Sequence, residues 1–542
     1  MKALTIFSIL GLLLTSCITK TEVDLIVHNA VIYTIDEEEN QFEAMAIHNG
    51  IIVAIGKENQ ILNKYKGLEV IDAKHHIVYP GFIDAHCHFL GYGLSLQKVN
   101  LLHSKSFEDV IEKCKQFNKT RNPVWITGRG WDNTKWKDKQ FPTKKKLDLA
   151  FPTKPVLIRR IDGHAAIANQ VALDLANITV TSKVNGGTIV KENGELTGVL
   201  IDNAVDLVLD IIPKPTLANK KEALITAQRN CFEVGLTTVD DAGLGKEDVQ
   251  LIEKLHTTGE LKMRVYAMLT DSKENFAYYL DTLGEPYRTE RLTVNSFKFY
   301  GDGALGSRGA CLLKPYQDDS TFGMLLQDTS HFQKYAKILY DKGFQMCTHS
   351  IGDSTSRFIL KTYGFVLEEN NDKRWRIEHA QIIDSSDFSL FRKYSIVPSV
   401  QPTHATSDMS WAVLRLGKQR LRFGYAYRKL LKQNGWLPLG TDFPIEGINP
   451  LTTFYAAVAR KNKDGLPKNG FQIENSLSRL EALKGMTIWA ALANFEETQK
   501  GSLEVGKVAD FVFLNMDILK VEERDLLNAK VTTTFINGEQ VF

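Results

Sequence analysis

The sequence predicts an α/β protein: a TIM (β/α)8 barrel, with a discontinuous β-sandwich built from both termini and an insertion after the first barrel strand. Three observations lead to this fold class. Strand-like and helix-like segments alternate over most of the chain, which is typical of parallel sheets with helical crossovers. Short strands with hairpin turns occur at both ends. A long gap separates the first two predicted barrel strands.

Length and composition set broad limits on the function. The chain has 542 residues, of which 43% are hydrophobic and 24% are charged, as expected for a globular protein with more than one domain. The formal net charge is only +2, which argues against a nucleic-acid partner. We expect a small-molecule substrate. The oligomeric state stays open, with a homodimer as one alternative.

The first residues are typical of a secretion signal. The apolar run 4–14 follows a lysine and is too short for a transmembrane helix. It ends in Leu-Thr-Ser-Cys17, which resembles the lipobox of bacterial lipoproteins. The resemblance implies that residues 1–16 are removed and that lipid on Cys17 anchors the protein in the cell envelope. Ile18 in place of an aspartate favours the outer membrane in a Gram-negative cell, while a plain signal peptide is the alternative.

The two ends of the chain share a strand-rich pattern. Turn residues such as Asn49-Gly50 and Asn537-Gly538 separate or follow short apolar strands, and Asn-Gly is a favoured hairpin turn. Each end is too small to fold well alone, so we expect residues 17–79 and 496–542 to form one β-sandwich. The predicted strands are 24–28, 30–34, 44–48, 51–55, 510–514 and 531–536.

Residues 80–495 have the pattern of the barrel. Eight strand-like segments occur, most of them spaced for a βα unit, with helix-like segments such as 221–233 and 331–342 between them. Proline is unfavourable inside a strand, so Pro398 and Pro438 weaken the last two predicted strands. The eight predicted strands are 82–86, 236–240, 264–269, 294–300, 344–349, 375–379, 396–401 and 436–442.

The gap after the first barrel strand is too long for a βα loop. We therefore expect an insertion at about residues 90–215, with strand-like segments at 124–127 and 156–159. Barrel active sites lie at the C-terminal ends of the strands. An insertion that leaves this end is well placed to take part in substrate selection.

The first barrel strand ends in two histidines, His86 and His88. Residues i and i+2 of a strand point to the same side, so both imidazoles can bind one metal ion. A His-x-His pair alone is more often structural. The later strands favour a metal site instead, because a barrel brings their C-terminal ends close to the C-terminal end of the first strand. Those ends add four candidates, namely Lys298, His349, His379 and Asp442.

Several motifs along the chain support the same conclusion. They are Pro80-Gly-Phe-Ile-Asp-Ala-His-Cys-His88, Gly128-Arg-Gly-Trp-Asp132, Arg160-Ile-Asp-Gly-His164, Phe297-Lys-Phe-Tyr-Gly-Asp-Gly303, His349-Ser-Ile-Gly-Asp353, Arg376-Ile-Glu-His-Ala-Gln381, Gly440-Thr-Asp-Phe-Pro444 and the segment 501–510. Together they resemble the amidohydrolase superfamily, specifically its family-3 branch related to N-substituted formamide deformylase. The resemblance covers nearly the whole mature chain.

The resemblance implies a site with two divalent metals, most often zinc. In that pattern His86 and His88 bind the first metal. His349 and His379 bind the second, and a carboxylated Lys298 bridges the two.

The same resemblance implies hydrolysis of a C–N bond other than a peptide bond, in an amide, an N-substituted formamide or a cyclic amide (EC 3.5 class). A metal-bound hydroxide would attack the substrate. Asp442 would touch the first metal, take the proton of the hydroxide and deliver it to the leaving amine. His164, from the insertion, is a candidate to polarise the scissile carbonyl together with the second metal.

Other polar residues at or just after strand ends are candidates to contact the substrate or to support the ligands. The predicted substrate contacts are Trp131, Asp132, Asp302, Arg308, Gln401 and His404, with Asp353 and Gln381 as further candidates. Cys87 points away from its neighbouring histidines on a regular strand, so we expect it in the core.

Two other functions stay open at this stage. A mononuclear, deaminase-like hydrolase would keep the fold, with Lys298 uncarboxylated and His379 as a hydrogen-bonding group. A surface binding lipoprotein without catalysis is the other, although the presence of all six proposed ligands argues against it. The sequence identifies neither the substrate nor the native metal.

Overall fold

The computed structural model describes residues 20–161 and 163–542. The predicted signal peptide and Cys17 lie outside these residues. Among the described residues, no helix combines the length and the apolar composition needed to cross a bilayer. The chain divides into two compact units, one with residues up to Cys87, Arg229–Val249 and Lys262–Phe542, the other with His88–Gln228 and Gln250–Leu261.

A sheet of seven parallel strands in the order β21-β20-β19-β18-β16-β15-β8 forms the centre of the first unit. Its strands are buried along most of their length, as in a parallel sheet covered on both faces. The strands are β8 (Phe82–Cys87), β15 (Leu236–Leu244), β16 (Arg264–Thr270), β18 (Leu292–Tyr300), β19 (Gln345–Ser350), β20 (Arg376–His379) and β21 (Val397–Ser399), and the short β17 (Tyr287–Arg288) pairs with β18.

The eighth predicted strand, 436–442, is an extended segment rather than a regular strand. Among the described residues, its only β-bridge is an isolated parallel one, between Leu439 and Val400. Pro438 has no N–H to donate, and the Leu439 N–H donates to Gly485 instead of a strand. The segment still closes the barrel, because the Gly440 N–H donates to Val400 on one side and the Asp442 N–H donates to His86 on the other.

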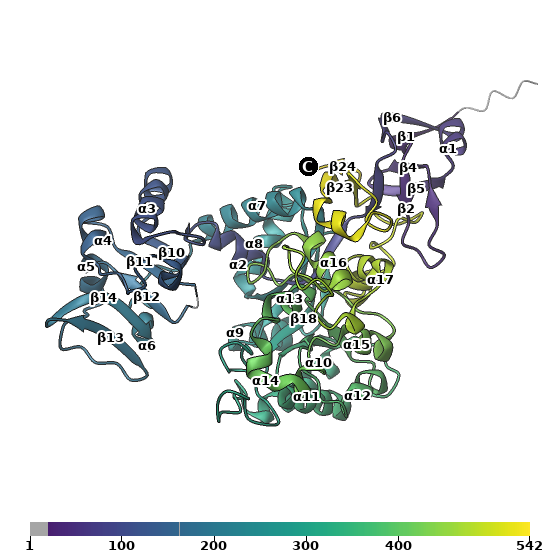
Figure 1. Ribbon diagram of the computed structural model, residues 1–542. Helices are drawn as coiled ribbons and strands as arrows, with labels where there is room; N and C mark the ends of the chain where they lie inside the picture. Colours follow the sequence, from purple (N-terminus) through teal and green to yellow (C-terminus); the bar gives the residue numbers. More distant parts are fainter. Residues whose placement is uncertain (1–19, 162) are drawn as a thin grey trace, which may run out of the picture. The chain divides into compact units, whose positions relative to one another are not determined.

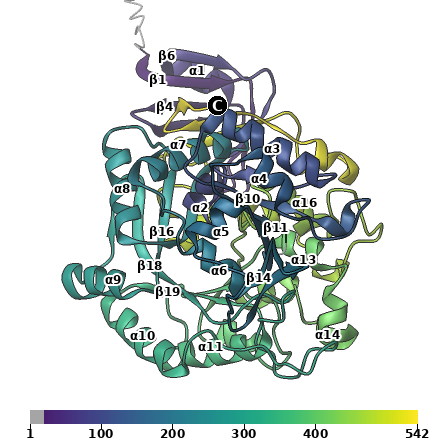
Figure 2. The same ribbon diagram turned by 90° about the vertical axis from the view of Figure 1, so that its left-hand side faces the viewer.

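Helices follow the strands around this sheet. Figure 2 shows α10 (Thr329–Lys342) and α11 (Asp353–Val366) beside β18 and β19, and the Tyr363 hydroxyl of α11 lies 2.7 Å from the Thr348 hydroxyl of β19. Helix α10 ends at Lys342, and the next residue, Gly343, caps it with a φ of +79° that glycine adopts without strain. The other helices from residue 217 onward are α7 (Leu217–Glu233), α8 (Lys246–Thr257), α9 (Lys273–Asn275), η2 (Phe276–Leu283), α12 (Phe388–Lys393), α13 (Pro402–Asp408), α14 (Ala412–Leu421), α15 (Tyr427–Asn434), α16 (Pro450–Ala459), η3 (Ile473–Asn475), α17 (Arg479–Gly485), α18 (Ile488–Ala493) and η4 (Glu523–Asn528).

Strands from both ends of the chain lie side by side in the first unit (Figure 1). One sheet has the order β5-β4-β1-β6, and the other, β24-β23-β22-β7-β2-β3, combines N-terminal and C-terminal strands. One core contains residues of both sheets, among them Val27, Met45 and Phe511. The elements are β1 (Thr21–His28), β2 (Val31–Tyr33), β3 (Gln41–Phe42), β4 (Ala44–His48), β5 (Ile51–Gly56), α1 (Glu58–Lys64), β6 (Tyr65–Asp72), β7 (Ile77–Pro80), β22 (Phe511–Leu514), β23 (Val531–Ile536) and β24 (Glu539–Gln540).

The second unit contains a six-stranded sheet of order β13-β14-β12-β11-β10-β9. Side chains of α3 and α4 join a core with Val156 and Ile158 of β11, whereas side chains of α5 and α6 join another core with Leu157. Alternate residues of a strand face opposite sides, so helices cover both faces of this sheet. The elements are α2 (Phe89–Ser95), β9 (Val99–Asn100), α3 (Phe107–Arg121), β10 (Ile126–Trp131), η1 (Asn133–Lys135), α4 (Lys145–Ala150), β11 (Val156–Arg160), β12 (Ala165–Ala168), α5 (Gln170–Leu175), β13 (Gly187–Glu192), β14 (Glu195–Asp202) and α6 (Asn203–Leu209).

The predicted α/β barrel is thus confirmed for its first seven strands. All six predicted terminal strands are also present, and those at 44–48 and 531–536 have the predicted bounds. The predicted strand 124–127 starts two residues later, at Ile126.

A buried ion pair links the barrel to a C-terminal strand and supports a prediction about stability. Arg264 of β16 donates from Nε to Oδ2 of Asp510 over 2.6 Å, and both side chains are at most 5% exposed. Substituting Asp510→Ala leaves a buried guanidinium uncompensated, so we expect the free energy of unfolding to fall by about 3–5 kcal/mol. Urea unfolding followed by fluorescence measures this loss.

The control for this prediction is Lys66→Ala, which removes an exposed ion pair with Glu22. We expect a change below about 1 kcal/mol there. Equal effects of the two substitutions would contradict the role given to the buried pair.

Candidate active site

Three strand ends and the closing segment bring four predicted ligands together in the first unit. In β8, Nε2 of His86 lies 3.1 Å from Nζ of Lys298 in β18 and 3.9 Å from Oδ1 of Asp442. The rings of His86 and His379 have centroids 4.9 Å apart. His86, Lys298 and His379 lie at or near the C-terminal ends of their strands. All four side chains are buried and so are shielded from bulk water.

Two groups of potential metal ligands share Asp442. One consists of His86, His88 and Asp442, and the other of His379, His404 and Asp442. Within each group, one ligand atom from each residue lies within 4.8 Å of the others. His404 was expected to contact the substrate, and the second group was not foreseen from the sequence.

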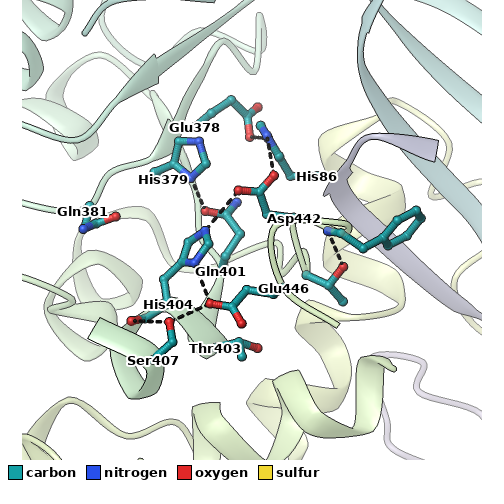
Figure 3. Close-up of polar contacts among 12 residues, drawn as sticks. His86, Glu378, His379, Gln381, Gln401, Thr403, His404, Ser407, Asp442 and Glu446 are labelled. Atoms are coloured by element: carbon teal, nitrogen blue, oxygen red, sulfur yellow. Dashed lines mark hydrogen bonds and ion pairs between the residues drawn. The ribbon is translucent and has the colours of Figure 1, made fainter. Parts of the chain in front are cut away.

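Three of these histidines share one arrangement, which Figure 3 shows. In each, a side-chain oxygen lies next to Nδ1. This leaves Nε2 of His86 and of His379 for the centre of the site, whereas Nε2 of His404 contacts Asp442. The pairs are His86 with Glu378 at 2.5 Å, His379 with Gln401 at 2.7 Å and His404 with Glu446 at 3.1 Å. An acceptor at Nδ1 fixes the tautomer and the ring orientation of a metal-binding histidine.

His349, at the end of β19, lies beside this cluster. Its ring centroid is 4.5 Å from that of His379, and its Nε2 is 3.7 Å from Oδ1 of Asp302. None of the described residues makes a hydrogen bond with this buried Nε2 atom. A buried nitrogen without such a partner is costly unless a ligand binds it.

The electrostatics favour neutral imidazoles in the cluster. Burial, and then the charge of Lys298, lowers the pKa of His349 well below its usual range. Burial, followed by His349, does the same to the pKa of His379. Neutral imidazole is the form that binds a metal ion.

Glu378 and His404 favour their charged forms, unlike His349 and His379. Burial alone would raise the pKa of Glu378, but His86, Arg376 and Lys298 lower it to about 2. Burial would lower the pKa of His404, yet hydrogen bonds and charge from Asp442 and Glu446 raise it to about 10. His404 therefore lies between two carboxylates that favour its protonated form.

The backbone is unusual at two of the site residues. His379 has a φ of +73° and Asp442 has a φ of +62°, in the left-handed region that non-glycine residues rarely adopt. The bend at the end of β20 also explains why Glu378 and His379, which are adjacent, both reach the cluster. Strict strand alternation would have sent them to opposite sides.

Asp84 connects the closing segment to β8. Its Oδ1 accepts the Thr441 N–H over 3.0 Å, and its Oδ2 accepts the Thr441 hydroxyl over 2.6 Å. Asp84 precedes His86 by two residues and so shares its side of the strand. The spacing of two residues from His86 is the sequence signal for the supporting role of Asp84, which was not among the predicted site residues.

The Asp302 carboxylate forms hydrogen bonds with the backbone at the start of the loop after His349. Its carboxylate accepts backbone N–H groups of Cys311, Ile351 and Gly352 and the hydroxyl of Thr355. Burial raises the pKa of this group to about 6. These contacts favour the supporting role predicted for Asp302, and its contact with a substrate stays a prediction.

Gln401, Arg308, Gln381 and Asp353 also have partners within the protein. Gln401 supports His379, and the Arg308 guanidinium pairs with Asp318 at 2.9 Å. Gln381 donates to the Tyr425 hydroxyl over 3.0 Å, and Asp353 accepts the Leu313 N–H over 2.8 Å. The position of Gln401 beside His379 matches the second of the two predicted roles, support of a candidate ligand rather than contact with the substrate.

The remaining candidates belong to the second unit. Trp131 is fully buried in its core, and its indole N–H donates to Ile158. Its position favours a packing role over the predicted substrate contact. Asp132 pairs with Arg160 at 2.9 Å and caps η1. His164 is exposed and lies 2.9 Å from the Asp202 carboxylate, and its catalytic role stays a prediction.

The chemistry of the cluster fits a divalent metal. Imidazole nitrogen and carboxylate oxygen are ordinary zinc ligands, and the residues present supply both. The oriented Nε2 atoms of His86 and His379 and the hydrogen-bond-free Nε2 of His349 support this fit.

Comparisons with known proteins agree with the geometry. The model of the amidohydrolase family matches residues 69–542. The chain belongs to the amidohydrolase family. It is 31% identical to YtcJ of Bacillus subtilis, over 95% of this chain and 98% of that protein. It is 24% identical to N-substituted formamide deformylase of Arthrobacter pascens, over 95% and 97% of the two chains.

A solved structure gives the same result for this amidohydrolase. The crystal structure of an uncharacterized metal-dependent hydrolase from Pyrococcus horikoshii matches with a TM-score of 0.79 and 28% identity, covering 92% of this chain and 99% of that one. The family and these relatives support a metal-dependent hydrolase that acts on a small molecule.

The Glu378 contact leads to a prediction about metal affinity. Glu378→Gln keeps the side-chain shape but removes the charge that holds Nδ1 of His86. We expect a loss of about 10–100-fold in zinc affinity, the usual cost of removing such a support. Competition of the metal-free protein with a chromogenic chelator measures the dissociation constant.

Glu369→Gln is the matched control, because Glu369 is 63% exposed and pairs with Lys393. It should bind zinc as the unmodified protein does. An unchanged affinity in Glu378→Gln would contradict the supporting role.

Proposed function

We propose that this amidohydrolase cleaves a C–N bond other than a peptide bond, in an amide, an N-substituted formamide or a cyclic amide. The observation that carries the proposal is the buried cluster of His86, His379 and Asp442 around Lys298. The near full-length similarity to a protein named N-substituted formamide deformylase supports a C–N bond as the target.

The proposal includes two divalent metals, with zinc as the expected ion. His86, His88 and Asp442 would hold one, and His349 and His379 the other. A carbamate on Lys298 would bridge them, formed when the amine nitrogen bonds to the carbon of CO2 and loses a proton. When bound, zinc lowers the pKa of water that it binds to roughly 7 and polarises a carbonyl group.

Asp442 has the central proton-transfer role in this proposal. Its carboxylate accepts the proton of the attacking water as the new C–O bond forms. It then gives that proton to the departing nitrogen, which takes the electron pair of the broken C–N bond. The burial of Asp442 supports this role, because a carboxylate shielded from water keeps a fixed position.

His164 remains a proposed donor to the scissile carbonyl oxygen. Its contact with Asp202 holds Nδ1, so Nε2 is the atom that would donate. A donor aimed at the developing negative charge lowers the barrier of acyl transfer.

We further propose the cellular setting that the first residues imply. Lipid on Cys17 would anchor the protein in the cell envelope, at the outer membrane in a Gram-negative cell. Residues 17–79 and 496–542 would act as one β-sandwich, and the insertion at about 90–215 would select the substrate. A homodimer remains part of the proposal.

Hydrolysis of a substrate panel tests the bond class. The panel contains N-acyl amino acids, N-substituted formamides, cyclic amides and simple esters, with zinc-loaded protein. We expect turnover of at least one amide class, and a fall of about 10²–10⁴-fold in Asp442→Asn, because that substitution removes the proton acceptor.

Asp464→Asn, a change at an exposed aspartate, is the control and should keep full turnover. Equal turnover in Asp442→Asn and the unmodified protein would contradict the role of Asp442. Hydrolysis of esters alone would contradict the bond class.

Metal counting tests the bridging role of Lys298. We expect about two zinc equivalents in the unmodified protein and about one in Lys298→Ala, because the bridge would be lost. Elemental analysis of dialysed protein measures the count, and added acetate should restore part of the second equivalent by supplying carboxylate oxygens.

One equivalent in the unmodified protein would instead favour the mononuclear, deaminase-like alternative. Two zinc equivalents and full activity in Lys298→Ala would contradict the proposed carbamate.

A further inference from the structure

We infer that His404 and Glu446 are positioning residues that fix the orientation of the Asp442 carboxylate. This inference rests on the proposed function and deepens it. Within it, His404 acts on the reaction through Asp442, and Glu446 acts through His404. Neither residue belongs to the two metal-ligand sets or to the proton-transfer route of the proposed function, although His404 lies within ligand distance of His379 and Asp442.

The two oxygens of Asp442 have different surroundings. Oδ2 lies 3.1 Å from Nε2 of His404, whereas Oδ1 is directed toward the other side, 3.9 Å from Nε2 of His86. The backbone is held as well, because the Asp442 N–H donates to the His86 carbonyl over 2.8 Å. A hydrogen bond at Oδ2 therefore decides which oxygen faces the ligand cluster.

His404 can hold Oδ2 because its ring is fixed at both nitrogens. Nδ1 lies 3.1 Å from Oε1 of Glu446, and Nε2 contacts Asp442. The three side chains are 7–17% exposed. Hydrogen bonds are stronger where water is largely excluded, so the two contacts hold the ring in one orientation.

Glu446 is in turn positioned by the chain around it. The turn after Asp442, in which the Ile445 N–H donates to the Asp442 carbonyl over 2.8 Å, brings Glu446 back beside the same residue. Oε1 also accepts the Ser407 hydroxyl over 2.6 Å. Ser407 lies three residues after His404 in α13, on the same face of the helix.

Figure 3 shows the resulting chain of contacts from Ser407 through Glu446 and His404 to Asp442. It ends at the carboxylate to which we assign proton transfer. Without His404, the Asp442 carboxylate can turn about its Cβ–Cγ bond, and either oxygen can face the cluster. Loss of a support of this kind typically costs 10–100-fold in activity or metal affinity.

Kinetics of His404→Asn, Glu446→Gln and the double variant test the inference, with the best amide of the panel. We expect kcat to fall by about 10–100-fold in His404→Asn and by about 10-fold in Glu446→Gln, with KM changed less than about twofold. The double variant should be no slower than His404→Asn within about threefold, because residues that act in series are not additive. His404→Gln, whose longer side chain brings an amide donor closer to the position of Nε2 than asparagine does, should recover part of the rate.

Cobalt binding provides a readout that needs no substrate. Calorimetry and the visible absorption of the Co²⁺-loaded protein should show weaker binding, by about 10–100-fold, and a changed spectrum in His404→Asn. The matched control is His331→Asn, since His331 forms a similar pair with Asp271, at 2.7 Å, elsewhere in the unit. It should leave kcat, cobalt affinity and the spectrum unchanged.

The outcomes separate this inference from the proposed function. A panel without turnover would sink the proposed bond class, while the cobalt measurements would still decide the positioning role. Unchanged cobalt affinity and spectrum in His404→Asn would overturn the positioning role of His404. So would multiplicative losses in the double variant, because they would show that Glu446 does not act through His404.

Discussion

Closure of the barrel between β8 and the segment 436–442 is the constraint on which the site depends. The Asp442 N–H donates to His86, and Asp84 accepts two hydrogen bonds from Thr441. These contacts bring the first and last parts of the barrel together, more than 350 residues apart in the chain. They place a histidine and a carboxylate side by side, and the other site residues gather around this pair.

A second layer of side chains gives the cluster its chemistry. Glu378, Gln401 and Glu446 each contact Nδ1 of one histidine, so the rings are oriented before any metal binds. Preorganised ligands lose little freedom on binding, which favours both affinity and a defined geometry. The left-handed backbone at His379 and Asp442 is consistent with strain retained at a functional site.

Family membership and site geometry answer different questions. The amidohydrolase family match and the buried ligand cluster establish the general class, a metal-dependent hydrolase. The substrate depends on loops and on the insertion, because one fold supports many chemistries. The second unit, with its own six-stranded sheet and two cores, is a large separate structure in which such selectivity can evolve.

The sequence alone predicted seven of the barrel strands and placed His86, Lys298 and His379 at or near strand ends, because strand pattern and strand ends are local properties. The tertiary structure decided what supports them. Glu378 lies 292 residues from its partner His86, and no local pattern predicts such a pair. The tertiary structure also places Trp131 in a core and Gln401 beside Nδ1 of His379. Burial and hydrogen-bond partners depend on how distant segments pack. The extended form of the eighth segment has the same cause: Pro438 lacks a donor, and the Leu439 N–H is directed to Gly485.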